Sequence, residues 1–122
     1  MLSRPPGAGP KILVADDDDL LSEVVSQSLR RNGYRVSCAP RGVISPELTV
    51  GVDLVVLDAH IPGVDFDSTI RFLQESHIAV LVLTGEASPP PGARPDQYLG
   101  KPVDLEDLLA AVKRLAVTRS VG

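Results

Sequence analysis

The sequence predicts an α/β fold in which a parallel β-sheet carries helices on both faces. Two observations support this fold class. Short runs that are apolar throughout are typical of strands buried on both sides, and they alternate with segments whose apolar residues recur at helical spacing. The length of 122 residues suits one hydrophobic core, so one domain is expected.

The predicted elements follow one another from residue 11 onward. Apolar runs predict the strands KILVA (residues 11–15), RVSCA (35–39), DLVVLD (53–58), the apolar part of SHIAVLVLTG (76–85) and QYLGKP (97–102). Helical spacing predicts helices within LLSEVVSQSLRRNGY (20–34), DSTIRFLQES (67–76) and LEDLLAAVKRLA (105–116). The pair Asn32-Gly33 ends the first helix, and Asp104 is expected to cap the last.

The two ends of the chain are expected to lie outside the domain. Residues 1–10 are rich in proline and glycine and predict a flexible tail. The domain is expected to span residues 11–117, and residues 118–122 form a tail or the start of a linker to an output region.

Composition narrows the classes of function. A net charge of −4 argues against binding to nucleic acid or to an acidic membrane through bulk charge. The first ten residues lack the apolar region of a signal peptide, and the run IAVLVL is too short to cross a bilayer, so a cytoplasmic protein is expected. The lone Cys38 cannot form an intrachain disulfide, which fits a reducing compartment, and its apolar neighbours predict a core position.

Polar residues stand at the ends of four predicted strands. Asp16 and Asp17 follow the first strand, Asp58 ends the third, Thr84 the fourth, and Lys101 follows the fifth. Because neighbouring parallel strands lie about 4.8 Å apart and end at one edge of the sheet, these groups are expected to meet in one cleft.

Three carboxylates in one cleft repel one another, by about 4 kcal/mol for a pair at ~4 Å and an effective dielectric constant near 20. One lysine compensates only in part. Mg²⁺ suits such a site, because it binds a few carboxylates together with waters and a phosphate. The cation would also let Asp58 attack a phosphorus atom, after which Lys101 would pair with the new phosphate.

These residues lie in motifs that together resemble the receiver domain of two-component response regulators. The motifs are ILVADDDD, DLVVLDAHIPG, VLVLTG and YLGKP, in this order. The resemblance implies a flavodoxin-like three-layer sandwich, as in the chemotaxis regulators, with five parallel strands in the order 2-1-3-4-5. It also implies bacterial signal transduction, in which a sensor histidine kinase donates a phosphoryl group and a protein-interaction surface then switches. The chain is then a phosphoacceptor with at most self-catalysed phosphotransfer and autodephosphorylation, and no enzyme in the usual sense.

The resemblance also implies a role for each site residue. Asp58 is the phosphoacceptor, and Mg²⁺ is held directly by Asp17, Asp58 and the backbone carbonyl of His60, and by Asp16 mainly through water. Thr84 is the switch hydroxyl, Lys101 contacts the phosphate, and Tyr98 is the aromatic that swings inward. His60 and Glu86 together tune the loss of phosphate. Asp18 and Asp19 are instead expected at the cap of the following helix.

The sequence departs from the family pattern in three places. Between Thr84 and Tyr98 the stretch GEASPPPGARPDQ holds four prolines, so the fourth helix of the family is expected to be missing or greatly reduced. The stretch VISPELTVG predicts a short or poorly formed second helix. Phe66 stands where the family commonly has glycine, which predicts a stiffer loop with an exposed aromatic ring.

These departures leave an alternative function open. The fourth helix belongs to the face that the family commonly uses for dimerisation and output. The alternative is therefore a phosphorylation-independent protein-binding module with an atypical output face. An output domain, a downstream protein and a homodimer remain open as partners, whereas contacts of this domain with nucleic acid or membrane are not expected. A phosphohydrolase is disfavoured, because His60 stands where such an enzyme needs a second acid.

Overall fold

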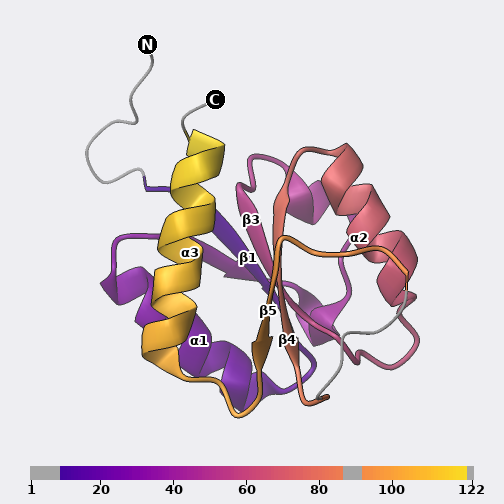
Figure 1. Ribbon diagram of the computed structural model, residues 1–122, viewed down its shortest axis with the longest axis horizontal. Helices are drawn as coiled ribbons and strands as arrows, with labels where there is room; N and C mark the ends of the chain where they lie inside the picture. The colour runs from indigo at the N-terminus through magenta and orange to yellow at the C-terminus, as the bar shows by residue number, and fades with distance from the viewer. Residues whose placement is uncertain (1–8, 87–91, 121–122) are drawn as a thin grey trace.

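The predicted strands form one parallel sheet in the order β2-β1-β3-β4-β5, which confirms the expected fold class (Figure 1). The strands are β1 (Lys11–Ala15), β2 (Arg35–Cys38), β3 (Leu54–Asp58), β4 (Ala79–Thr84) and β5 (Gln97–Gly100). Every residue of β3 and β4 is buried, as expected for central strands of a parallel sheet.

The structure, a computed structural model, describes residues 9–86 and 92–120. Residues 1–8 of the predicted tail, the prolines Pro89–Pro91 and the last two residues lie outside the described residues. The last helix reaches Ser120, three residues beyond the predicted end of the domain. No helix among residues 9–86 and 92–120 has the length and apolar character needed to span a membrane.

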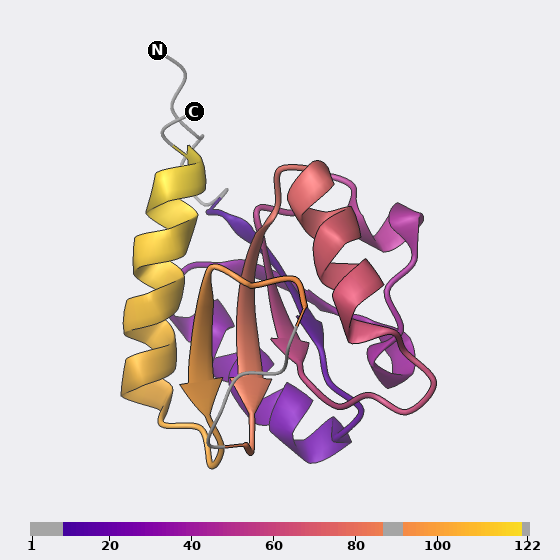
Figure 2. The same cartoon turned by 45° about the vertical axis from the view of Figure 1, so that its right-hand side comes forward.

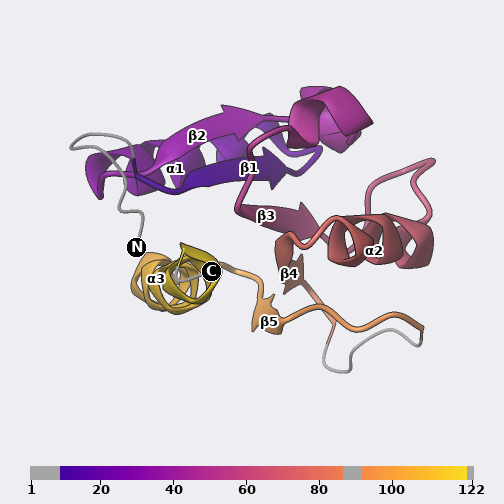
Figure 3. The ribbon, with the colours of Figure 1, turned by 90° about the horizontal axis from the view of Figure 1, so that it is seen from above.

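Helices cover both faces of the sheet (Figure 3). They are α1 (Asp19–Arg31), α2 (Phe66–Glu75) and α3 (Leu105–Ser120), with two short 3-10 helices, η1 (Pro40–Gly42) and η2 (Pro46–Thr49). On β1, Ile12 and Val14 pack in one apolar cluster with α1 and α3, whereas Leu13 and Ala15 pack in a second cluster with α2. Alternate side chains of one strand therefore hold the two helical layers.

Side-chain caps set where the helices begin. The Asp18 carboxylate accepts a hydrogen bond from the backbone N–H of Leu21 at 3.0 Å and caps α1, as predicted. The Asp104 carboxylate accepts from the N–H groups of Glu106 and Asp107 at the start of α3. Because α1 and α3 begin just beyond β1 and β5, their first turns border the edge where the strands end.

The connection from β4 to β5 differs from the family pattern as the prolines predict. In the described part of this connection, residues 85–86 and 92–96, there is no helix. Residues 92–96 instead pass along α2 before β5 begins (Figure 2). The Ala93 N–H donates to the Asp67 carboxylate, and the side-chain amide of Gln74 donates to the Arg94 carbonyl at 2.5 Å. Two contacts with α2 thus fix the chain where the family has a helix.

Of three further predictions for the fold, the one on the second helix is confirmed and those on Cys38 and Phe66 are wrong. The segment after β2 contains only η1 and η2, which confirms a poorly formed second helix. The prediction that Cys38 fills the core is wrong: its side chain is exposed, because β2 is an edge strand with no fully buried residue. Phe66 is half-buried against the α2 cluster, so the prediction of an exposed ring is also wrong.

Candidate functional site

Three carboxylates gather where β1 and β3 end. One carboxylate oxygen from each of Asp16, Asp17 and Asp58 lies within 4.8 Å of the other two. Asp16 and Asp58 are buried, with 4% and 6% of their surface exposed, whereas Asp17 faces solvent. Hard oxygen ligands in a half-open cluster match the chemistry of Mg²⁺, which keeps several waters in its coordination shell. The residues present therefore fit the predicted cation.

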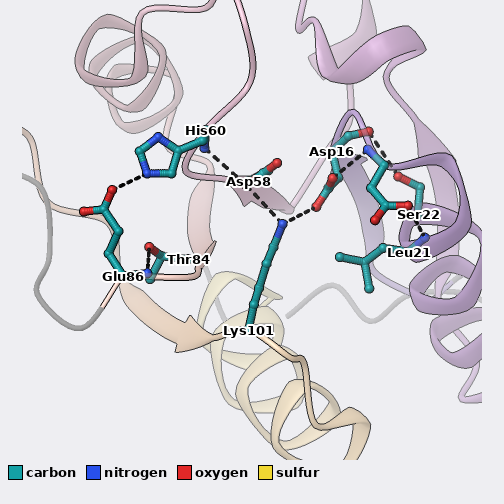
Figure 4. Close-up of polar contacts among 9 residues, drawn as sticks. Asp16, Leu21, Ser22, Asp58, His60, Thr84, Glu86 and Lys101 are labelled. Carbon is teal, nitrogen blue, oxygen red and sulfur yellow. Dashed lines mark hydrogen bonds and ion pairs between the residues drawn. The ribbon is translucent and has the colours of Figure 1, made fainter.

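Lys101 reaches this cluster from the end of β5. Its ammonium nitrogen Nζ lies 3.2 Å from Asp58 Oδ1 and 3.3 Å from Asp16 Oδ2, and thus stands between the two buried carboxylates (Figure 4). The structure brings all five of the residues predicted at the strand ends to one edge of the sheet, although they span 85 positions of the sequence.

Burial and charge act against each other on these groups. Burial raises the pKa of Asp16 above its ordinary value, and the neighbouring Asp58 raises it further. The Asp18 N–H, which donates to Asp16 Oδ1 at 2.8 Å, and the Lys101 ammonium lower it only in part. Burial alone would lower the pKa of Lys101, but Asp16 and Asp58 more than offset this, so its pKa is raised. The lysine therefore stays charged, and one ammonium group stands beside three carboxyl groups.

The raised pKa of Asp16 predicts a pH dependence for the metal-free protein. Above the ordinary value of 3.8 the folded state retains a proton on Asp16 that the unfolded state has lost. Asp16 therefore contributes its full share of the free energy of unfolding below pH 3.8. This contribution is lost as the pH rises through the folded-state pKa of Asp16. As the pH rises from 3.8 through the folded-state pKa of Asp16, the parent should lose stability relative to Asp16→Asn. Denaturant unfolding in chelator at a series of pH values measures this difference, and parallel curves would contradict it.

Thr84 and Tyr98 lie on the neighbouring strands. The Thr84 hydroxyl is buried at the end of β4 and accepts a hydrogen bond from the Glu86 N–H at 3.1 Å. The Tyr98 ring packs in the α2 cluster, and its hydroxyl is buried without a hydrogen-bond partner among the described residues. A buried hydroxyl without a hydrogen-bond partner costs free energy, so the position of the Tyr98 side chain should respond when the residues packed around it move.

His60 and Glu86 meet beside Asp58 and Thr84. His60 Nε2 lies 2.5 Å from Glu86 Oε1, and both side chains are largely exposed (Figure 4). The backbone N–H of His60 donates to Asp58 Oδ1 at 3.2 Å, which holds the start of the β3–α2 loop beside the cluster. The pair predicted to act together is thus in contact, while the role of the His60 carbonyl as a metal ligand stays a prediction.

The sequence reasoning missed a residue that supports the site. Ser22, buried in α1, donates from its hydroxyl to the backbone carbonyl of Asp16 at 3.2 Å (Figure 4). Together with the N–H of Asp18, it fixes both the main chain and the side chain of Asp16. A small polar residue on the buried face of a predicted helix is the signal that could have pointed to it.

One protein family and several curated proteins match most of this chain. The family described as "Response regulator receiver domain" matches residues 12–113. The DNA-binding dual master transcriptional regulator RpaA of Synechocystis is 37% identical over 119 residues, which cover 87% of this chain and 48% of that protein. The response regulator MprA of a Mycobacterium species is 38% identical over 114 residues, covering 86% and 50%. The chain thus spans about half the length of the curated relatives it matches.

Solved structures show the same fold. The receiver domain of a Francisella response regulator superposes with a TM-score of 0.76 at 26% identity, covering 90% of this chain and 98% of that one. A signal receiver domain from Pseudomonas fluorescens gives a TM-score of 0.81 at 22% identity, with coverage of 93% and 99%.

Proposed function

The chain belongs to the family of response regulator receiver domains, and from this premise we propose that Asp58 accepts a phosphoryl group in a Mg²⁺-dependent reaction. The observation that carries the proposal is the burial of Asp58 beside two further carboxylates and an ammonium group. The burial of Asp58 keeps bulk water away from it. The ammonium group and a bound cation could then stabilise the charge of a phosphoryl group on Asp58.

In the proposed reaction, a carboxylate oxygen of Asp58 attacks the phosphorus atom of a phosphohistidine in a sensor histidine kinase. The new O–P bond forms as the N–P bond breaks, and the electron pair of that bond returns to the imidazole. Lys101 forms an ion pair with Asp58 before the reaction. Its ammonium group is positioned to donate hydrogen bonds to the incoming phosphoryl oxygens instead. A bound Mg²⁺, which Asp17 and Asp58 would hold directly and Asp16 mainly through water, would neutralise charge on the transferring oxygens.

The phosphoryl group adds a charge of about −1.5 to −2 to the cleft. Thr84 lies at the end of the strand next to Asp58, so its hydroxyl is positioned to turn from the Glu86 N–H toward this charge. The movement would alter the packing of Tyr98 on β5, a half-buried side chain whose hydroxyl has no hydrogen-bond partner among the described residues. We propose that an output region or a separate downstream protein reads this change, since the relatives are about twice as long as the matched part.

A phosphorylation-independent binding module remains the second candidate. It is favoured by the lack of a helix between β4 and β5 in the described part of that connection, because the family's usual output face is then altered. Amide NMR spectra with Mg²⁺ and the phosphate mimic beryllofluoride separate the two functions. Phosphorylation switching predicts shifts at Thr84, Tyr98 and residues 92–96. Shifts confined to the neighbours of Asp58 would favour the binding module.

The contact between His60 and Glu86 leads to a prediction about the lifetime of the phosphorylated state. The two side chains are in contact, and the His60 backbone N–H donates to Asp58, so the pair is placed to limit the access of water to the phosphorylated Asp58. His60→Ala and Glu86→Ala are each expected to speed dephosphorylation several-fold, and the double variant should add little because both changes break one contact. Loss of phosphate can be followed by intact mass. His77→Ala, which changes the other, also exposed histidine, is the control, and parental rates in both variants would reject this role.

A further inference from the structure

The turn η1 after β2 packs against the acidic end of β1. Two consecutive residues of this turn have left-handed backbone conformations, Arg41 with φ 55° and Gly42 with φ 75°. The Ala39 N–H donates to the Val14 carbonyl at 2.9 Å, which anchors the turn on β1 just before Asp16. A strained turn is thus attached to the strand that presents the first carboxylate of the cluster.

Gly42 has no space for a side chain. A Cβ atom there would lie 2.9 Å from Cδ1 of Ile61 and 3.2 and 3.3 Å from the backbone carbon and nitrogen of Asp16. Ile61 is buried in the loop that follows Asp58. Gly42 therefore touches both segments that carry carboxylates of the cation site. Gly51 has nearly the same φ, 73°, but nothing lies within 4 Å of its corresponding position.

We propose that Gly42 is a positioning residue for the cation site, because it allows the turn to approach and fix the main chain of Asp16. This inference rests on the proposed function. The Ile61 methyl can move aside, but the Asp16 backbone must yield by a few tenths of an ångström if a methyl group is added. Asp16 cannot absorb the shift freely, since its carboxylate and its carbonyl are held by Asp18 and Ser22.

A shift of the Asp16 main chain also moves Asp17, which is the next residue in the chain and is expected to bind the ion directly. Mg²⁺ requires short metal–oxygen distances of about 2.0–2.1 Å in near-octahedral geometry, whereas Ca²⁺ accepts longer and more variable ones. Gly42→Ala is therefore expected to weaken Mg²⁺ binding by about tenfold, the size of effect typical of residues that orient metal ligands. Binding of Ca²⁺ should weaken less, so the preference for Mg²⁺ over Ca²⁺ should fall. A general loss of stability would not change that preference.

The test compares Gly42→Ala with Gly51→Ala in the full chain. The two substitutions impose the same backbone strain, but only the first crowds Asp16. Mg²⁺ and Ca²⁺ affinities are measured by calorimetry, and the Asp18 amide, which reports its bond to Asp16, is followed by NMR in chelator. The proposal predicts weaker Mg²⁺ binding and a shifted Asp18 amide in Gly42→Ala alone. Equal affinities and equal Asp18 signals in the two variants would overturn it.

Failure of the proposed function would look different. In that case the parent would bind no Mg²⁺, while the metal-free Asp18 amide would still report whether Gly42 positions Asp16. If Gly42→Ala does not fold, the double variant Gly42→Ala with Ile61→Val removes the nearest obstructing atom, Cδ1. The contact with Asp16 persists in this variant, so its Asp18 amide should still differ from that of Gly51→Ala. Identical signals would refute the positioning role.

Discussion

Asp58→Asn is expected to abolish phosphoryl transfer from a small phosphodonor, because an amide lacks the nucleophilic carboxylate oxygen. It should also stabilise the metal-free protein. The attraction of Asp58 to Lys101 and its repulsion from the buried Asp16 nearly cancel. The repulsion from the exposed Asp17 remains and is screened by solvent, so the free energy of unfolding should rise by up to about 1 kcal/mol.

Intact mass and denaturant unfolding measure the two effects. The parent should gain the mass of one phosphoryl group in the presence of Mg²⁺, and Asp58→Asn should gain none. Asp107→Asn, at an exposed position in the first turn of α3, serves as the control and should behave like the parent in both measurements. Phosphorylation of Asp58→Asn at the parental rate would show that another residue accepts the group.

Lys101→Met is expected to change stability and phosphotransfer in the same direction. The methionine keeps the length of the side chain but leaves the buried Asp16 and Asp58 without their ammonium partner. Loss of such a partner should destabilise the metal-free protein at neutral pH by about 1–3 kcal/mol. Loss of a charged donor to the transferring oxygens should slow phosphorylation by about 10²–10³-fold.

Mg²⁺ affinity separates the role of this lysine from that of the carboxylates. Because the ammonium group competes with a cation for Asp16 and Asp58, Lys101→Met should bind Mg²⁺ at least as tightly as the parent. Lys113→Met on the exposed side of α3 is the matched control. Unchanged stability and unchanged phosphorylation in Lys101→Met would remove the lysine from the proposed mechanism.

The sequence predicted the sheet and the cluster of strand-end residues because both depend on strong local patterns. A run such as LVVLD can be buried on both faces only in a central strand, and the residue that ends it must then lie at the sheet edge. Asp58 and Lys101, far apart in the chain, were therefore assigned to one cleft because each stands at the carboxyl end of a strand in the same parallel sheet. The lack of a helix in the described part of the β4–β5 connection, residues 85–86 and 92–96, was predictable for a similar reason, since proline is excluded from helix interiors.

Contacts made through space were not predictable in the same way. Gly42 approaches Asp16 only because η1 turns back on β1, and no periodic pattern encodes that approach. The bond from Ala93 to Asp67 likewise depends on the path of a loop. Cys38 was misassigned because an apolar run does not reveal whether its strand lies at the centre or at the edge of the sheet.

A titration of the metal-free protein with Mg²⁺, followed by amide NMR, addresses the assembly of the cation site. If Asp16, Asp17 and Asp58 surround one cation, saturable shifts should concentrate at these residues and at the ends of β1 and β3. The signals of residues remote from this edge, such as those at the start of β2, should stay in place. Weak, non-saturating shifts spread over the acidic residues of the surface would contradict the cation site and the phosphoacceptor role built on it.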